Sequence, residues 1–427
     1  MSSARPSLSD IGNSAVGRAL VSVVHLDPSR INDGALDALG DSDWDQLVTI
    51  AAYQRVRPLL HERLLQSGRW QRVPPPAWQR LVAACRDIAI RKMHMHAELS
   101  ALLSALGQHG VPAIVLKGAY LGPAVYENLA LREMNDLDVM VPIDRLALAV
   151  DLAQARGYAG VRAFDVEADT RGNHHVTRLI KQPFTGLEFH WNITPPLTAT
   201  TIDPALLWNA ARPVRLGNVD ALALSPTDLL LHVCFHQSFL HQFEFGLRPS
   251  CDIARVIEKI GPTLDWAEVV RQATERGWSR GVGVALHVAK DLAGANVPHD
   301  VLQTFGIDDL PGTAALATQL VWALPDEGRD IPISLAPLGG GGSLDHNLRA
   351  ITRRVFLPRP HLTGLYGVSA DARWWWLLYG YRIVDLVRRR ATDGLRLLLR
   401  RSTAATDLSK RRNLMRNWLT AQRPDDA

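Results

Sequence analysis

Cysteine is scarce in this sequence, and its scarcity excludes two kinds of small scaffold. The 427 residues include three cysteines, Cys85, Cys234 and Cys251. They lie far apart and form no CxxC pair, so neither a structural zinc site nor a disulfide framework is indicated. We therefore expect a chain that folds around an ordinary hydrophobic core in a reducing compartment, and the cytoplasm is the expected location.

Long hydrophobic runs and a strong net charge are also absent. No run of about 18 apolar residues occurs, and residues 1–24 lack the apolar centre and cleavage pattern of a signal peptide. The sequence therefore predicts no transmembrane segment. The 47 basic and 43 acidic residues leave a net charge of +4. This value is too small to indicate a broad basic surface, which disfavours long nucleic acid as a partner.

The pattern of apolar residues divides the chain into four predicted segments. Residues 1–95 are expected to form a helical N-terminal region and residues 96–215 an α/β core. Residues 216–335 are expected to form a helical domain, which opens with Ser225 as N-cap and Pro226 at the first helical position. Residues 336–427 read as a glycine-rich linker, GGGG at 339–342, followed by a basic amphipathic helical tail. The predicted fold class is α+β, with a mixed sheet between these helical regions.

Helices and strands are also expected within these segments. The periodicity predicts two helices within residues 44–67, another at 78–95, and a further one that ends near Gly107. Residues 111–116 are a short apolar run between glycines, which indicates a buried strand that ends in a glycine turn. A short helix is predicted at 124–131, with its N-terminus toward this turn and suited to a phosphate. Later, residues 174–181 and 186–193 are expected to pair as a hairpin.

Two acidic residues alternate with apolar ones in the segment Asp136-Leu137-Asp138-Val139. Because side chains change face at every residue of a strand, both carboxylates are expected on the same face. Like charges this close raise each other's pKa unless a cation neutralises them. Oxygen ligands without cysteine select Mg²⁺ or Mn²⁺ over zinc. The pair therefore predicts a divalent metal site.

A third carboxylate follows about fifty residues later, in GLEFHWNI. Glu188 and His190 are expected on one face of a strand, and Leu187 and Phe189 on the other. Glu188 would complete the metal site. For His190, the alternatives are a core histidine and a residue that faces the substrate or supports a metal ligand.

A glycine turn after a strand, Asp-x-Asp on a second strand and an acidic residue on a later strand together resemble the nucleotidyltransferase superfamily that includes DNA polymerase beta and the minimal nucleotidyltransferases. Within it, the LKG turn, the RxxNDLD segment at 132–138 and the ExHW strand at 188–191 are similar to the group called uncharacterised nucleotidyltransferases. The core of the resemblance spans residues 97–193, and looser similarity continues to about residue 300.

The resemblance implies a mixed-sheet nucleotidyltransferase core in which Asp136, Asp138 and Glu188 hold the metal ions. It also implies that the turn of Lys117 and Gly118 approaches the triphosphate. One residue departs from the family pattern, because Ala119 follows Gly118 where the superfamily commonly has serine.

Two further groups of residues are open to more than one interpretation. Arg132 could contact the substrate phosphates, for which arginine offers a rigid fork, or pair with one of the aspartates. His232 and His236 lie four residues apart on a predicted helix, and packing at a domain interface is favoured over metal binding because no acidic or cysteine partner has zinc-like spacing.

The sequence supports three hypotheses for function. The first is a metal-dependent nucleotidyltransferase that uses the acidic triad to move a nucleoside monophosphate from an NTP to the hydroxyl group of a small molecule, peptide or protein. The second is a catalytically weak binding or regulatory module, such as a toxin–antitoxin component or a biosynthetic-cluster partner, which the alanine at position 119 motivates. The third is a phosphohydrolase that uses the carboxylates with His190, His232 and His236.

Overall fold

A computed structural model describes residues 8–160, 164–183, 185–196, 198, 200–307, 311–323, 376–382 and 403–420 of the chain. By contacts, the chain divides into two compact units, one of residues 1–324 with 415–427 and one of residues 325–414. The predicted linker at 339–342 and most of the predicted basic tail lie outside the described residues. The division into four segments stays a prediction.

Five helices and two 3₁₀ turns precede the core of the protein. Ser14 caps the second helix, where its hydroxyl accepts a hydrogen bond from the Gly17 N–H at 3.0 Å. The predicted pair of helices within residues 44–67 is confirmed as α4 and α5, and Pro58 lies in the first turn of α5, where its missing donor is tolerated. The elements are α1 (Leu8–Asn13), α2 (Ala15–Val24), η1 (Pro28–Arg30), α3 (Asp33–Asp37), α4 (Asp41–Tyr53), α5 (Arg57–Gln66) and η2 (Arg69–Arg72).

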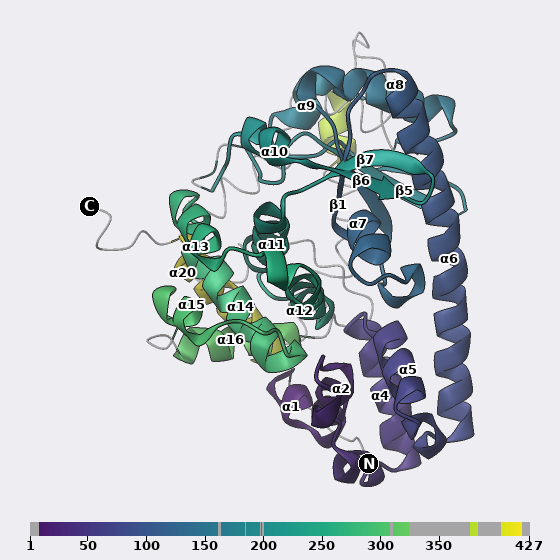
Figure 1. Cartoon of the computed structure of the whole chain (residues 1–427), viewed down its shortest axis with the longest axis vertical. Coiled ribbons are helices and arrows are strands. Elements are labelled where there is room, and N and C mark those ends of the chain that lie inside the picture. Colours follow the sequence, from purple (N-terminus) through teal and green to yellow (C-terminus); the bar gives the residue numbers. More distant parts are fainter. Residues whose placement is uncertain are drawn as a thin grey trace. The chain divides into compact units, whose positions relative to one another are not determined.

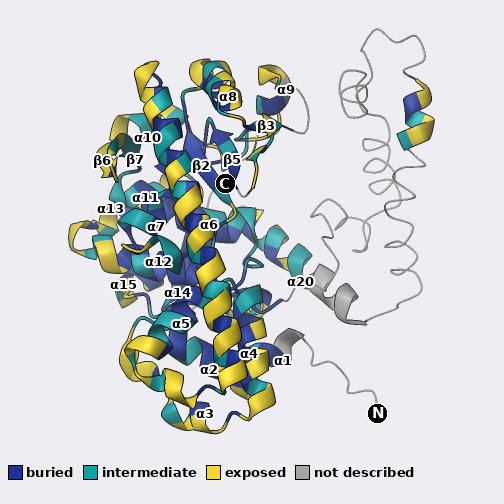
Figure 2. Ribbon diagram, turned by 90° about the vertical axis from the view of Figure 1, so that its right-hand side faces the viewer, coloured by how far each residue is buried: buried dark blue, intermediate teal, exposed yellow. Residues whose placement is uncertain are grey.

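One long helix, α6 (Pro75–Gln108), replaces the two helices predicted at 78–95 and before Gly107. The sequence between Met95 and Leu99 contains neither glycine nor proline, so nothing interrupts the helix there. It contacts α4 and α5 and also the sheet, which joins the N-terminal helices to the core (Figure 1). Its outer side is exposed along its length (Figure 2).

Seven strands form one mixed sheet in the order β3-β4-β5-β2-β1-β7-β6. Strand β2 is parallel to β5 and antiparallel to β1, and β1 is parallel to β7. The predicted hairpin is confirmed, because β4 and β5 are antiparallel neighbours, whereas β6 and β7 were not predicted. The strands are β1 (Ile114–Leu116), β2 (Asp136–Met140), β3 (Ala159–Gly160), β4 (Leu179–Lys181), β5 (Thr185–His190), β6 (Arg212–Leu216) and β7 (Val219–Ala223).

The hydrophobic core lies on one face of this sheet. Leu137 and Val139 of β2 and Leu187 and Phe189 of β5 are fully buried in it, together with leucines of α6 and the apolar side of α8 (Leu146–Ala155). Because side chains alternate along a strand, the residues between them, Asp138 and Glu188 among them, point to the other face. The core therefore determines which face carries the polar residues.

The segment between β1 and β2 differs from its prediction. The predicted helix at 124–131 is wrong, because helix α7 (Lys117–Ala124) starts directly after β1 and ends where the predicted helix begins. Pro123 lies inside α7, and a 3₁₀ turn, η3 (Leu129–Leu131), follows. In the sequence, Pro123 suggested the start of a helix. In the structure, the helix already starts at Lys117, six residues earlier. The remaining elements of this region are η4 (Ile143–Arg145), α9 (Val166–Thr170) and α10 (Pro204–Ala210).

Helices follow the sheet, as the sequence predicts. Ser225 caps α11 by accepting a hydrogen bond from the Asp228 N–H at 3.1 Å, and Pro226 is the first helical residue. The elements are α11 (Pro226–Phe235), η5 (His236–Leu240), α12 (Arg248–Ile260), η6 (Gly261–Thr263), α13 (Trp266–Glu275), α14 (Ser279–Ala293), α15 (His299–Thr304), α16 (Pro311–Val321) and α20 (Thr403–Thr420). Within the described part of the chain, no helix combines the length and the hydrophobicity needed to cross a membrane.

Candidate metal and nucleotide site

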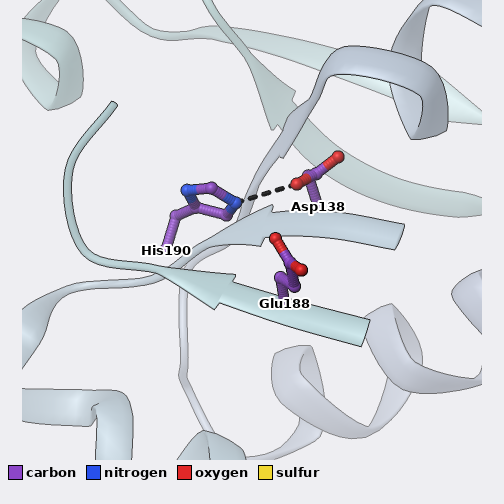
Figure 3. A group of neighbouring side chains, drawn as sticks. All are labelled: Asp138, Glu188 and His190. Atoms are coloured by element: carbon purple, nitrogen blue, oxygen red, sulfur yellow. Dashed lines mark hydrogen bonds and ion pairs between the residues drawn. The ribbon is translucent and has the colours of Figure 1, made fainter. Parts of the chain in front are cut away.

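Asp138 and Glu188 lie side by side on the polar face of the sheet. The parallel register of β2 and β5 pairs Asp138 with Glu188 and Met140 with His190. The side chains of Asp138, Glu188 and His190 point toward one another (Figure 3). Asp138 and His190 are buried, at 3% and 0% exposure, whereas the Glu188 side chain keeps 18% of its surface exposed. The site is therefore inside the protein but open at Glu188.

These three residues could together hold a metal ion. Each offers one ligand atom, and the three atoms lie within 4.8 Å of one another. Among the described residues, this is the group of acidic, histidine and cysteine side chains that converges in this way. Two carboxylate oxygens suit a hard divalent cation, and the imidazole offers a nitrogen.

Asp138 is held by two partners on the same oxygen. Lys117 Nζ and His190 Nε2 each lie 2.8 Å from Asp138 Oδ1. Burial alone would raise the pKa of Asp138, but the charge of Lys117 and the hydrogen bond from His190 more than offset it and hold this pKa well below its usual range. Asp138 is therefore ionised even where it is buried.

Glu188 has the opposite electrostatic environment. Burial, and then the negative charge of Asp138, raise the pKa of Glu188 above its ordinary value of 4.5. The nearest basic group is His175, whose Nδ1 lies 3.9 Å from Glu188 Oε2. Asp138 is thus stabilised as an anion and Glu188 is not. A bound cation would stabilise the anionic form of Glu188.

Histidines surround this pair. Burial, and then Lys117, lower the pKa of His190 to about 4, so its imidazole is neutral at pH 7. A neutral His190 that donates from Nε2 to Asp138 leaves Nδ1 as an acceptor, and this buried atom has no hydrogen-bond partner. The rings of His174 and His175 lie 5.3 and 5.1 Å from that of His190. Sequence reasoning missed these two residues, although the adjacent histidines at the predicted strand were a signal.

The turn between β1 and α7 brings Lys117 and Gly118 to the site. Lys117 has φ +42°, in the left-handed region that non-glycine residues rarely adopt. A Cβ on Gly118 would lie 2.3 Å from Arg132 Nη1 and 2.8 Å from Met134 Sδ, so only glycine fits there. Ala119 is fully buried in the hydrophobic core, where the hydroxyl of a serine would also be buried. The free backbone N–H groups of a helix start are suited to an anion.

Asp136 and Arg132 lie apart from the convergent group. Asp136 stands at the start of β2, where its side chain is 32% exposed, and Arg178 Nη1 lies 3.8 Å from its Oδ2. Arg132 is buried and forms a bidentate ion pair with Asp252 of α12, with both bonds at 2.8 Å. Arg132 therefore pairs with neither Asp136 nor Asp138, the two aspartates predicted as its possible partners. Two guanidinium nitrogens of Arg132 are occupied by Asp252, and the third, Nη1, lies against Gly118.

His232 and His236 are near the site but do not join the metal-binding group. Burial, and then the charges of Lys117 and His190, lower the pKa of His232 to about 3. His236 instead contacts His241, with 3.2 Å between their Nε2 atoms. Within the described chain, the groups that converge for a metal do not include either residue. Both are therefore neutral histidines, His232 on α11 and His236 at the start of η5, and packing at a domain interface stays a prediction.

The mixed sheet, the acidic pair on adjacent strands and the turn that starts a helix beside them are the features of a nucleotidyltransferase. The chain belongs to the family described as uncharacterised nucleotidyltransferase, whose family model matches residues 40–294. The match confirms the resemblance and begins well before residue 97, so it includes α4, α5 and α6. A comparison with curated proteins finds no match.

Proposed function

We propose that this protein is a metal-dependent nucleotidyltransferase that transfers a nucleoside monophosphate from an NTP to a hydroxyl group. The observation that carries the proposal is the pairing of Asp138 with Glu188 across β2 and β5, beside the start of α7. In the transfer, the acceptor hydroxyl gives its proton to water as its oxygen forms a bond to the α-phosphorus, the bond from this phosphorus to the bridging oxygen breaks, and pyrophosphate leaves with the displaced electron pair.

The residues present fit a divalent ion. Asp138 and Glu188 would hold it through carboxylate oxygens, which favours Mg²⁺ or Mn²⁺. Asp136 shares their face and lies half-buried at the start of β2, where it is available as a further ligand. Bound there, an ion supplies positive charge for the attacking hydroxyl and the departing phosphates.

The protein's own groups position the reactants. Lys117 supplies a positive charge, with its Nζ 2.8 Å from Asp138 Oδ1, that would stabilise the charge gained by a phosphate oxygen bound beside it. The first N–H groups of α7 belong to the same turn as Lys117, and the free N–H groups of a helix start favour an anion. His190 orients the Asp138 carboxylate by its hydrogen bond and does not itself carry a charge.

The acceptor is proposed only by its class. A hydroxyl of a small molecule, a peptide or a protein side chain fits the chemistry equally well. Long nucleic acid is disfavoured, since the net charge of the chain is only +4.

A binding or regulatory module without turnover is the second candidate. The ion pair of Lys117 with Asp138 favours it, because the ammonium group takes up an oxygen that a metal would need. A module of this kind would bind the nucleotide but would not release pyrophosphate. Pyrophosphate release therefore distinguishes the nucleotidyltransferase from this second candidate.

Calorimetric titration of an NTP with and without Mg²⁺ tests the proposal. We expect Mg²⁺ to strengthen nucleotide binding in the wild type, and Asp138→Asn and Glu188→Gln each to lose most of this gain, about tenfold or more, because each removes a charged ligand. Asp144→Asn is the matched control, since this carboxylate is 73% exposed. Mg²⁺-dependent binding that survives both site variants would exclude the assignment.

A further inference from the structure

Two arginines outside the predicted site share one aromatic ring. The guanidinium carbon of Arg55, in the turn between α4 and α5, lies 4.0 Å from the ring centre of Phe245. That of Arg248, the first residue of α12, lies 4.8 Å from the same centre. His241 stacks on this ring at 4.2 Å. Residues nearly 200 positions apart in the sequence are thus brought to one place.

Backbone contacts hold the two arginines together. The buried Gln54 accepts a hydrogen bond from the Leu247 N–H at 2.8 Å through its side chain, and its backbone carbonyl accepts one from the Arg248 N–H at 3.3 Å. Gly246 packs so closely against Gln54 that a Cβ there would lie 2.9 Å from the Gln54 Cα. The arrangement is therefore a fixed feature of the fold rather than a chance meeting of surface side chains.

The nearby carboxylates are already paired with other arginines. Glu133 forms a bidentate ion pair with Arg57, at 3.0 and 2.9 Å, and Asp252 forms one with Arg132. Among the described residues, no carboxylate forms an ion pair with Arg55 or Arg248. Arg248 is 6% exposed, donates from Nη1 to the Glu133 carbonyl at 2.6 Å, and leaves its buried Nε without a partner.

Positive charge without a directly paired carboxylate is costly inside a protein, although Glu133 and Asp136 act on Arg55 and Asp252 and Asp136 act on Arg248 from a distance. Burial, and then the charge of Arg132, lower the pKa of Arg248 to about 9, and Arg55 contributes to the same effect. An anion that binds between two arginines relieves this cost, and the planar fork of arginine matches phosphate oxygens.

The arginines lie near the strand that carries Asp138. The charge of Asp136, at the start of this strand, acts on both Arg55 and Arg248. The Arg248 side chain is also bonded to the carbonyl of Glu133, three residues before Asp136. A ligand with several phosphates offers one anionic group to each place, whereas a monophosphate has a single such group.

We propose that Arg55 and Arg248 form a subsite for the β- and γ-phosphates of the nucleoside triphosphate, while its α-phosphate lies at Asp138 and Glu188. The inference rests on the proposed function for the identity of the ligand, and both arginines lie within the family match at 40–294. The subsite supplies affinity for the leaving pyrophosphate, and it distinguishes a nucleoside triphosphate from a monophosphate.

Binding of inorganic tripolyphosphate, measured by calorimetry on the full chain, tests the subsite without the nucleoside. We expect Arg55→Gln to weaken this binding about tenfold to a hundredfold, the factor associated with lost charge-assisted hydrogen bonds. Arg248→Lys, which keeps the charge and loses the fork, should weaken it less. Arg63→Gln is the matched control, because Arg63 is also half-buried in the N-terminal region but bonds only to the carbonyls of His25 and Leu26.

Competition identifies the source of the phosphates. An equimolar mixture of the four NTPs should displace tripolyphosphate from the wild type, and a mixture of the four NMPs should not. Unchanged tripolyphosphate affinity in folded Arg55→Gln would overturn the subsite, and so would displacement by NMPs as strong as by NTPs. Loss of tripolyphosphate binding in Arg55→Gln but not in Asp138→Asn supports the subsite even if the proposed transfer reaction fails its own test.

Discussion

At the scale of single residues, the two carboxylates of the site are not equivalent. From the sequence, the natural expectation is mutual repulsion between Asp136 and Asp138. In the structure, Asp138 is instead stabilised by Lys117 and His190, and it is Glu188 that lacks a close cation. The difference arises from partners on other elements, which no local pattern in the sequence could indicate.

This difference predicts opposite effects on the stability of the metal-free protein. Asp138→Asn should lower the free energy of unfolding at pH 7 by about 3 kcal/mol, because it leaves the Lys117 charge without its partner. Glu188→Gln should raise it by roughly 1 kcal/mol, since it removes an anion that the folded state disfavours. Urea unfolding in the presence of EDTA measures both.

The effect of pH on the Glu188 variant gives an internal check. The pKa of Glu188 is raised in the folded state, so its contribution to stability is present below its ordinary value of 4.5 and is lost as the pH rises through the folded pKa. The advantage of Glu188→Gln over the wild type should therefore appear as the pH rises above 4.5. An advantage that is the same at pH 4 and pH 7 would refute this explanation.

At the scale of elements, the turn from β1 to α7 is the most constrained part of the site. Gly118 is surrounded by Arg132 and Met134, and Arg132 cannot move aside easily because Asp252 holds it. We expect Gly118→Ala to lower the free energy of unfolding by about 1–3 kcal/mol through overpacking. Gly107→Ala in α6 is the control, because its Cβ would meet nothing within 4 Å and alanine favours a helix. Equal stability of the two variants in urea unfolding would contradict the close packing at Gly118.

The sequence could predict those elements whose signals are local. Alternation of apolar residues correctly indicated the polar face of β2 and β5, and Ser225 with Pro226 correctly indicated the start of α11. The hairpin of β6 and β7 was missed although Gly217, with φ +60°, marks its turn. The ion pair of Arg132 with Asp252 joins residues 120 positions apart, and such pairs cannot be inferred from local spacing.

At the scale of the whole described fold, charged contacts connect the N-terminal helices, the sheet and the helices that follow it. Glu133, just before β2, binds Arg57 of α5 through its carboxylate and Arg248 of α12 through its carbonyl. Both helices are thereby fixed relative to the strand that carries Asp138. The family match from residue 40 agrees with this, since it extends over the same helices.

The most direct test of the central claim is the position of Mn²⁺ in crystals soaked with this ion and a non-hydrolysable NTP analogue. The anomalous scattering of manganese gives the position of the ion independently of how the protein atoms are refined. We expect a peak within about 2.5 Å of carboxylate oxygens of both Asp138 and Glu188, the range of metal–oxygen bonds. A peak bound only at other residues, or no peak at these two carboxylates when Mn²⁺ and nucleotide are saturating, would contradict it.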